Sequence, residues 1–301
     1  MAQKDKELKG VIPPIPTPFG SHGQVDHVAL RKNLDYWNAY DLSGYVVLGS
    51  NGETPYLTTN EKLEILETAR SVIPSDKWMI AGTGCESTRA TIELTCKAAE
   101  IGADAVLIVS PHFYTSKMTP EVLKKHYFMV ADKSPIPIIL YNVPAFTHVE
   151  LDSYLVAELS KHPNIIGIKE SGGNITKIAD MVRLTPKSFQ ILAGSGGFFF
   201  PSLTVGASGG IMAVANVVPK VMLDIYRLYQ EGRIETAAEL QRRIIPLNNA
   251  VTTRFGVAGL KAALDFLGCW GGPVRAPLLD LTEEERETLK VILEDTKQAC
   301  S

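Results

Sequence analysis

The hydrophobic residues of this 301-residue chain occur in short, nearly continuous runs, each followed by turn residues and then by a helical pattern. Unbroken apolar runs are typical of parallel strands that are covered on both faces, whereas half-exposed strands alternate apolar and polar residues. The runs recur at intervals of roughly 20–35 residues, which is the spacing of strand–helix units. The pattern predicts eight strands, beginning at about Gly10, Gly44, Trp78, Ala103, Ile136, Asn164, Gln190 and Gly209.

Several of the connecting segments carry clear helix signals. Residues 58–73 begin with a Thr/Asn cap and then repeat apolar side chains at helical spacing. A second helix is expected to end at Gly102, and a third to begin with Thr119 as its cap and Pro120 in its first turn. From about Pro219 onward the pattern is helical only. Breaks are expected there at Gly232, Pro246, Gly256 and Gly268.

These elements predict an α/β protein, a (βα)8 TIM barrel over residues 1–230 with a C-terminal helical extension over residues 231–301. The alternative is a doubly wound open sheet. Eight strand–helix units followed by helices alone favour the barrel. The length agrees, because α/β barrels reach this size as one domain.

Composition and charge exclude several classes of protein. Of the residues, 45% are hydrophobic and 21% are charged, which is typical of a globular protein. The net charge is −3, so the chain lacks the excess of basic residues that nucleic-acid binding requires. No apolar run reaches the roughly 18 residues of a membrane-spanning helix. No targeting segment is visible in the polar N-terminus, so we expect a cytoplasmic protein, or one in the mitochondrial matrix whose presequence has been removed. The six histidines are scattered, which argues against a metal site. The four cysteines lie far apart in the sequence, which argues against a zinc site or a disulfide framework; they are Cys85, Cys96, Cys269 and Cys300.

Lys169 closes the apolar run "NIIGIK", at the end of a barrel strand, where the chemistry of such folds takes place. Desolvating an isolated ammonium is costly, so burial favours the neutral amine. A neutral amine can attack a carbonyl and form an iminium. The alternative is a lysine whose stem is buried while its amine reaches solvent or pairs with Glu170. Its position in the barrel does not decide between the two.

Tyr141 ends the apolar run "IPIILY", and its phenol can relay a proton beside an iminium. The alternative is a core tyrosine whose hydroxyl bonds to the backbone. The turn "GSNGE" (residues 49–53) offers the hydroxyl of Ser50 and backbone N–H groups that can hold a carboxylate. Glu53, in this turn, is interpreted as structural. The segment "GSGGFFF" lacks the spacing of a dinucleotide loop, so no nicotinamide cofactor is expected.

Taken together, these segments resemble the pyruvate-dependent class I aldolases, the family that includes dihydrodipicolinate synthase and N-acetylneuraminate lyase. The resemblance covers nearly the whole chain. It is carried by an ordered set of motifs: "PPIPTPF" (13–19), "GSNGE" (49–53), "YNVP" (141–144), "GIKES" (167–171) and "RAPL" (275–278).

The resemblance implies a role for each motif. Lys169 is similar to the family's Schiff-base lysine, and Tyr141 to its proton-relay tyrosine. Ser50 would assist the relay, together with a Tyr114 lent across a dimer interface. The resemblance also implies a homotetramer, built as a dimer of dimers, with no metal or organic cofactor. The residues that would bind the substrate are Ser50, Asn51, Ser171 and Gly194.

The substrate is narrowed by departures from the family pattern. Dihydrodipicolinate synthases usually carry an arginine two residues after the "YNVP" proline, and an aromatic ring such as Phe146 cannot replace a guanidinium. Motifs such as "GCEST" and "HPNIIG" are most similar to 4-hydroxy-2-oxoglutarate aldolase, although Phe146 and His148 are not expected there.

We therefore expect a carbon–carbon lyase, an aldolase that cleaves a 4-hydroxy-2-oxo acid, with 4-hydroxy-2-oxoglutarate giving pyruvate and glyoxylate. The alternatives within the family are the synthase, N-acetylneuraminate lyase and a 2-keto-3-deoxy sugar acid aldolase. From another class, the alternative is a non-catalytic sensor that binds a 2-oxo acid.

Overall fold

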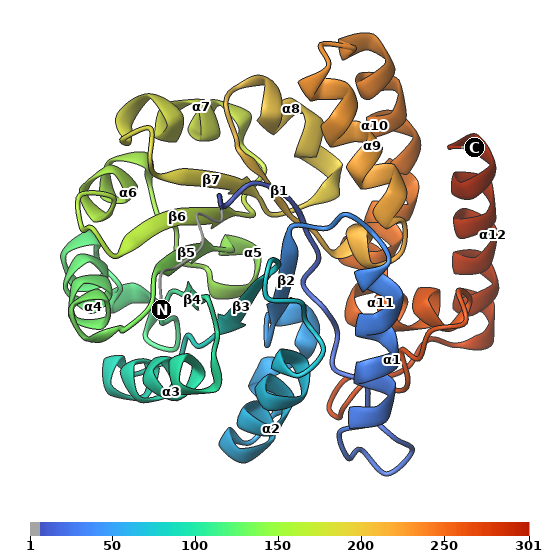
Figure 1. Cartoon of the computed structure of the whole chain (residues 1–301), viewed down its shortest axis with the longest axis horizontal. Helices are drawn as coiled ribbons and strands as arrows, with labels where there is room; N and C mark the ends of the chain where they lie inside the picture. The colour runs from blue at the N-terminus through green and yellow to red at the C-terminus, as the bar shows by residue number, and fades with distance from the viewer. Residues whose placement is uncertain (1–6, 301) are drawn as a thin grey trace.

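A computed structural model describes residues 7–300. Within this range, eight parallel strands alternate with helices as the apolar runs predict (Figure 1). Residues 1–6, which carry part of the expectation about targeting, lie outside the described residues. The strands are β1 (Gly10–Ile12), β2 (Gly44–Val47), β3 (Trp78–Gly82), β4 (Ala105–Val109), β5 (Ile138–Asn142), β6 (Ile165–Glu170), β7 (Gln190–Ala193) and β8 (Gly209–Ile211).

The sheet closes on itself, which confirms the TIM barrel. Each strand pairs with its neighbours in the order β1-β8-β7-β6-β5-β4-β3-β2. The remaining seam, between β1 and β2, is joined by a parallel bridge between Pro14 and Val46. The Ile15 N–H donates to the Val46 carbonyl at 2.9 Å, and the Ser43 N–H donates to the Val11 carbonyl at 3.0 Å. Closure leaves no free sheet edge, so the alternative of an open sheet is wrong.

The barrel wall carries an apolar layer on each face, because successive side chains of a strand point to opposite sides. The outer layer packs against the surrounding helices. The inner layer fills the barrel and leaves only its ends for chemistry. The inner layer includes Ile12, Val46, Ile80, Leu107, Ile139, Tyr141, Leu192 and Ile211.

The helices around the barrel begin and end largely where local signals predict. Thr58 and Glu61 form a capping box, Thr119 caps the helix that starts at Pro120, and Gly102 has φ +101° after another helix. The helices are α1 (His27–Asn38), α2 (Thr59–Arg70), α3 (Thr88–Ile101), α4 (Pro120–Lys133), the short α5 (Pro144–Thr147), α6 (Ser153–Leu159), α7 (Ile175–Leu184), α8 (Phe199–Thr204) and α9 (Pro219–Gln230).

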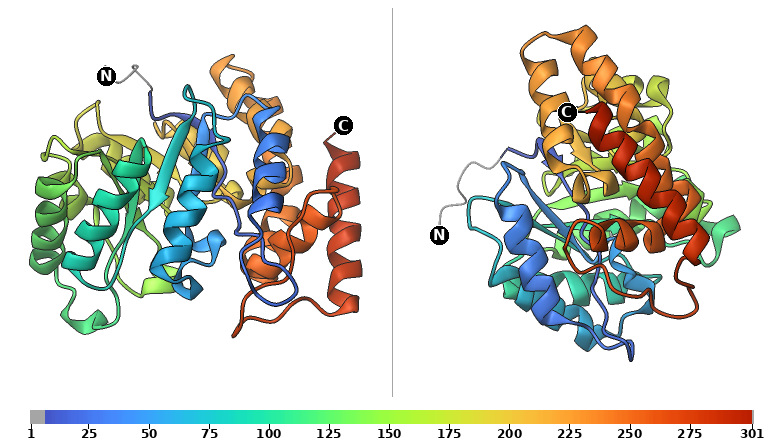
Figure 2. Two further views of the ribbon diagram at one scale, coloured as in Figure 1. Left: turned by 60° about the horizontal axis from the view of Figure 1, so that its bottom comes forward. Right: turned by 90° about the vertical axis from the view of Figure 1, so that its right-hand side faces the viewer.

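The C-terminal helices lie together on one side of the barrel (Figure 2). They are α10 (Ile234–Asn249), α11 (Gly256–Asp265) and α12 (Glu283–Ala299), and a π-helical turn joins the first two. The expected break at Pro246 is wrong, because Pro246 lies inside α10. A proline there removes one backbone hydrogen bond, and burial of neighbouring side chains such as Leu247 offsets that loss. The boundary at residue 230 falls between α9 and α10, and a division of the chain there stays a prediction.

His126 is a buried histidine on α4 whose imidazole titrates far from its usual range. Burial lowers its pKa from 6.5 to about 4, with a small opposing effect from Glu86. Its Nδ1 shares a hydrogen bond of 2.9 Å with Thr88 Oγ1, and its Nε2 has no hydrogen-bond partner among the described residues. The folded protein therefore resists protonating a group that the unfolded chain protonates readily.

This histidine should make stability fall in mildly acidic solution. Its contribution is fully present above pH 6.5 and is lost as the pH falls towards 4, because only the unfolded chain binds the proton in that window. The expected slope from this group is about 1.4 kcal/mol per pH unit. The variant His126→Gln should flatten the dependence of unfolding free energy on pH, measured by urea titration. Thr88→Val retains the imidazole and should keep the slope. If the unfolding free energies of His126→Gln and the wild type changed with pH at the same slope, this account would be contradicted.

Candidate active site

Lys169 and Tyr141 face each other at the carboxyl ends of neighbouring strands. They are register partners on β6 and β5, and Lys169 also pairs with Leu192 of β7. The Lys169 nitrogen lies 4.2 Å from the centroid of the Tyr141 ring. Both residues are buried, with 3% and 6% of their surfaces exposed. An amine and a phenol therefore share one small, water-poor space at the end of the barrel.

Glu170 does not serve as the partner of Lys169. It follows Lys169 on an extended strand, so the two side chains point to opposite faces. The fully buried Glu170 carboxylate pairs with Lys177 at 3.0 Å and accepts a hydrogen bond from Asn142 Nδ2 at 2.9 Å. Lys169 is thus neither solvated nor paired with its neighbour, which favours the interpretation as a reactive amine.

The turn after β2 places Ser50 beside Tyr141. The Ser50 hydroxyl lies 3.4 Å from the Tyr141 hydroxyl, a loose contact of the kind that tightens when substrate binds. Ser50 and the half-buried Asn51 belong to a single 3-10 turn. Thr17 Oγ1 donates to the Gly52 carbonyl at 2.7 Å and ties this turn to the segment after β1. The structure thus brings the predicted relay hydroxyl to the predicted relay tyrosine.

Ser171 and Gly194 meet at the ends of β6 and β7. The Gly194 N–H donates to the Glu170 carbonyl at 2.7 Å. A Cβ at position 194 would lie 2.8 Å from the Glu170 carbonyl oxygen and 1.9 Å from Ser171 Oγ, so this close approach of two backbones requires glycine. Within residues 7–300 the buried Ser171 hydroxyl has no hydrogen-bond partner. It is therefore free to bond to a substrate, which is consistent with the predicted binding role.

Tyr114 stands apart from these groups in a single subunit. It lies on the segment after β4 with 70% of its surface exposed, and its ring packs edge-on against Phe113 with centroids 5.0 Å apart. In the described part of the chain, no hydrogen bond links Tyr114 to Tyr141 or Ser50. Its proposed role as a residue lent to a partner subunit stays a prediction. An exposed aromatic pair is what such a contact requires.

Phe146 and His148 lie on the loop after β5. Phe146 is in α5 with 66% of its surface exposed. His148 ends this short helix with φ +52°, in the left-handed region. Neither residue offers a fixed cation for a second carboxylate on the substrate.

Polar groups outside the barrel support the site, and the sequence alone did not predict this role for them. Asn142 donates to Glu170, and its Oδ1 accepts the Leu151 N–H at 2.9 Å, which fixes the ends of β5 and β6. One signal in the sequence pointed to these groups. Asn142 and Glu170 directly follow Tyr141 and Lys169, and both are polar residues on otherwise apolar strands. Polar residues that face a buried outer layer need partners, and here they find each other.

Residues 7–300 contain no group of three or more histidine, cysteine, aspartate or glutamate side chains placed to hold a metal ion. The thiols of all four cysteines are free. None of the helices in this range combines the length and apolarity that crossing a bilayer requires.

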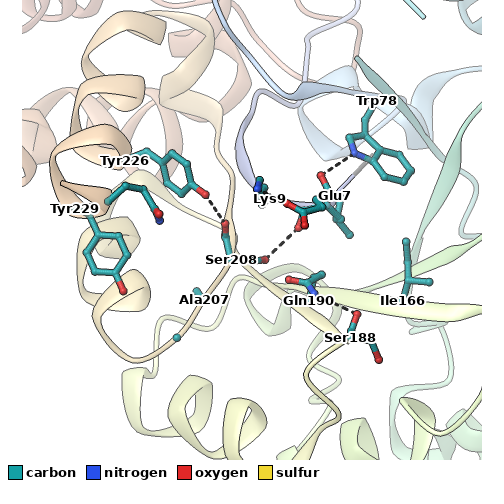
Figure 3. A pocket seen from close by; sticks show the side chains of 13 residues that line it. Glu7, Lys9, Trp78, Ile166, Ser188, Gln190, Ala207, Ser208, Tyr226 and Tyr229 are labelled. Carbon is teal, nitrogen blue, oxygen red and sulfur yellow. Dashed lines mark hydrogen bonds and ion pairs between the residues drawn. The ribbon is translucent and has the colours of Figure 1, made fainter. Parts of the chain in front are cut away.

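A cavity of about 590 Å³ opens at the opposite end of the barrel, where the strands begin (Figure 3). Its polar groups are largely satisfied by one another: Trp78 Nε1 donates to the Glu7 carbonyl at 3.2 Å, and the Tyr226 hydroxyl donates to the Ser208 carbonyl at 3.3 Å. It contains none of the predicted site residues. In barrels the active site lies at the carboxyl ends of the strands, so we assign the chemistry to Lys169 rather than to this cavity.

The sequence pattern that defines the dihydrodipicolinate synthetase family matches residues 7–296 of this chain. The chain belongs to this family. A 4-hydroxy-tetrahydrodipicolinate synthase of Methanothrix thermoacetophila is 37% identical over 95% of this chain and 96% of its own length. A dihydrodipicolinate synthase structure from Bacillus anthracis superposes with a TM-score of 0.92 at 32% identity, covering 96% of this chain and 98% of that one. A structure from Acinetobacter baumannii, described as complexed with pyruvate, gives 0.92 at 31% identity over 96% and 99% of the two chains.

Family membership establishes the class of chemistry. These enzymes form a covalent Schiff base between a lysine and pyruvate and need no external cofactor. The protein is thus a pyruvate-dependent enzyme of the class I aldolase type that acts on a small molecule. The finer resemblance to 4-hydroxy-2-oxoglutarate aldolase is not supported by these relatives, which are named as synthases. The relatives come mostly from bacteria and archaea and give no support to the mitochondrial alternative.

Proposed function

We propose that Lys169 attacks the C2 carbonyl of a 2-oxo acid and that the enzyme makes or breaks the bond between C3 and C4. The observation that carries this proposal is the buried Lys169 amine, which lies 4.2 Å from the Tyr141 ring and has no ion-pair partner in residues 7–300. Attack of the amine and loss of water give an iminium at C2. A positively charged iminium withdraws electrons from C3, so it replaces a metal ion as the electron sink.

Tyr141 is the proposed proton carrier. In the cleavage direction the tyrosine, with Ser50 beside it, removes the proton of the C4 hydroxyl. The C3–C4 electrons pass to the iminium and give an enamine, and an aldehyde leaves. Tyr141 then returns the proton to C3, and water releases pyruvate from Lys169. In the condensation direction the same enamine attacks an aldehyde, so one set of residues serves both. Backbone N–H groups of the turn at Ser50 and Asn51 are proposed to hold the C1 carboxylate.

Two candidates remain for the aldehyde. The names of the relatives favour the synthase, which joins pyruvate to a four-carbon amino aldehyde carrying its own carboxylate, aspartate 4-semialdehyde. The exposed Phe146 offers no bidentate partner to a second carboxylate, so it favours the second candidate, cleavage of a 4-hydroxy-2-oxo acid, where the aldehyde half has no carboxylate. The glyoxylate half of 4-hydroxy-2-oxoglutarate carries one, as the semialdehyde does, so Phe146 does not separate these two substrates. The comparisons therefore support the synthase more strongly.

Trapping with borohydride tests the formation of the iminium at Lys169, the step that cleavage and condensation share. After incubation with pyruvate and reduction, peptide mass spectrometry should find a pyruvyl adduct on Lys169. The surface residue Lys161 is a reference for nonspecific labelling, since its side chain is 66% exposed. An unmodified protein, or one labelled at other lysines alone, would overturn the proposed function. Binding of a 2-oxo acid without any turnover would instead identify a sensor.

Steady-state assays then separate the two aldehydes. We expect kcat/KM for the preferred partner to exceed that for the other by at least about 10²-fold, because substrates are discriminated by their differential binding in the transition state. The variant Phe146→Arg should raise the rate with aspartate 4-semialdehyde if the wild type is a cleavage enzyme. If the wild type already favours the semialdehyde, the cleavage proposal is wrong. Cleavage of sugar acids in preference to 4-hydroxy-2-oxoglutarate would identify the sugar-acid aldolase.

A further inference from the structure

A fully buried ion pair lies behind the turn that carries Ser50. The Lys261 nitrogen, on α11, is 2.5 Å from Oε1 of Glu53, the last residue of the turn. The two side chains are 1% and 0% exposed. Lys261 also donates to the Pro273 carbonyl at 2.7 Å. Burial lowers the pKa of Lys261, and the Glu53 carboxylate opposes that shift.

Arg275, also in the C-terminal extension, binds the same turn through hydrogen bonds. Its backbone N–H donates to Glu53 Oε2 at 2.7 Å. Its guanidinium donates to Glu61 Oε1 at 2.6 Å and to the Tyr56 carbonyl at 2.9 Å, on the segment that follows the turn. Both cations lie over the Phe19 ring, with Lys261 at 4.2 Å and Arg275 at 4.3 Å. Residues far along the chain therefore contact both oxygens of the Glu53 carboxylate: Oε2 accepts a hydrogen bond, whereas Oε1 is in the ion pair and has no hydrogen-bond partner in the described residues.

The backbone of the turn is strained at both ends. Leu48 has φ +63° and Glu53 has φ +54°, a region that residues other than glycine rarely adopt. The Glu53 N–H donates to the Ser50 carbonyl at 3.1 Å and closes the turn. A strained conformation persists only where its surroundings hold it, and such strain clusters at ligand clamps.

Stability alone is a weak reason for a buried ion pair. Apolar residues of similar volume often replace such a pair without loss of stability, because the two charges must be desolvated. What the pair supplies is a fixed direction, since contacts to both oxygens restrict the rotation of the carboxylate. The extension fixes a second active-site loop in the same way. Gln241 of α10 donates to the Gly196 carbonyl at 2.7 Å and accepts the Phe200 N–H at 2.9 Å, after β7.

We propose that Glu53 is a positioning residue, which Lys261 and Arg275 hold so that the turn at residues 49–53 presents its backbone N–H groups to the carboxylate of pyruvate. The inference rests on the proposed function. It assigns the C-terminal extension a part in substrate binding, although none of its residues needs to touch the substrate. It agrees with the interpretation that Glu53 is not an acid or base, and adds a role in substrate binding to its structural one.

Three variants test this role: Glu53→Gln, Lys261→Met and the double variant. Each single change leaves one buried partner uncompensated and should lower the melting temperature. Each should also raise KM for pyruvate at least tenfold, with KM for the aldehyde changed less than twofold. The double variant removes both charges and should regain most of the melting temperature while it keeps the raised KM. If the ion pair were purely structural, the double variant would regain both the melting temperature and the wild-type KM for pyruvate.

The control is Arg70→Met, which breaks the ion pair between Arg70 and Asp104 at 3.3 Å, at the opposite end of the barrel. It should lower the melting temperature without changing KM for pyruvate. A wild-type KM in folded Glu53→Gln, or in the double variant, would overturn the inference. If Glu53→Gln does not fold, the double variant gives the deciding value. Failure of the wild type to form an adduct at Lys169 would overturn the proposed function itself and is observed separately.

Discussion

Replacing Lys169 by methionine is expected to abolish turnover, with kcat reduced by roughly four to six orders of magnitude, the loss typical of removing a catalytic nucleophile. Methionine retains the length and apolar stem of the side chain but cannot form an iminium. The protein should remain folded, because the lost amine is buried and has no carboxylate partner in the described residues. The measurement is kcat, together with borohydride trapping and a thermal melt.

The matched control for this experiment is Lys161→Met, on the protein surface. Its side chain is 66% exposed and pairs with Glu158, so the variant should retain wild-type kcat and adduct formation. Residual kcat in Lys169→Met within tenfold of the wild type would mean that the reaction does not pass through this lysine. Loss of folding, in place of loss of chemistry, would return Lys169 to a structural role.

Tyr141→Phe should lower kcat by about 10²- to 10⁴-fold, the usual contribution of general acid–base catalysis. The phenyl ring keeps its place beside Lys169, so the contact at 4.2 Å survives and only the hydroxyl, with its neighbour Ser50, is lost. The variant should still form the pyruvyl adduct on prolonged incubation. Exchange of the C3 protons of pyruvate in deuterated water, followed by NMR, should slow by a similar factor because the enamine forms by loss of that proton.

The control here is a second buried tyrosine. Tyr45 lies on β2 in the outer apolar layer and donates a hydrogen bond of 2.8 Å to Asn38 Oδ1. Tyr45→Phe should cost about 1 kcal/mol of stability through the lost hydrogen bond and leave kcat unchanged. Wild-type proton exchange in Tyr141→Phe would show that another group moves the proton. Ser50→Ala would then be the next variant to measure.

The sequence alone determined the parts of this protein that depend on local order. Unbroken apolar runs placed all eight strands, and caps such as Thr58 and Thr119 placed helix starts, because these signals act over a few residues. Lys169 and Tyr141 could be singled out because each is a polar residue at the end of an apolar strand. The ordered motifs then gave the family, and the match over residues 7–296 confirms it.

Tertiary structure decided what depends on contacts between distant residues. The seam between Pro14 and Val46 closes the barrel, and the burial of α10 keeps Pro246 inside a helix that its sequence predicts to break. Glu53 was interpreted as structural from its turn, and only the fold shows its partners, Lys261 and Arg275, which lie more than two hundred positions away. Periodicity carries no information about such pairs, because they form only when helices pack against the barrel and exclude water from charges that must then find partners.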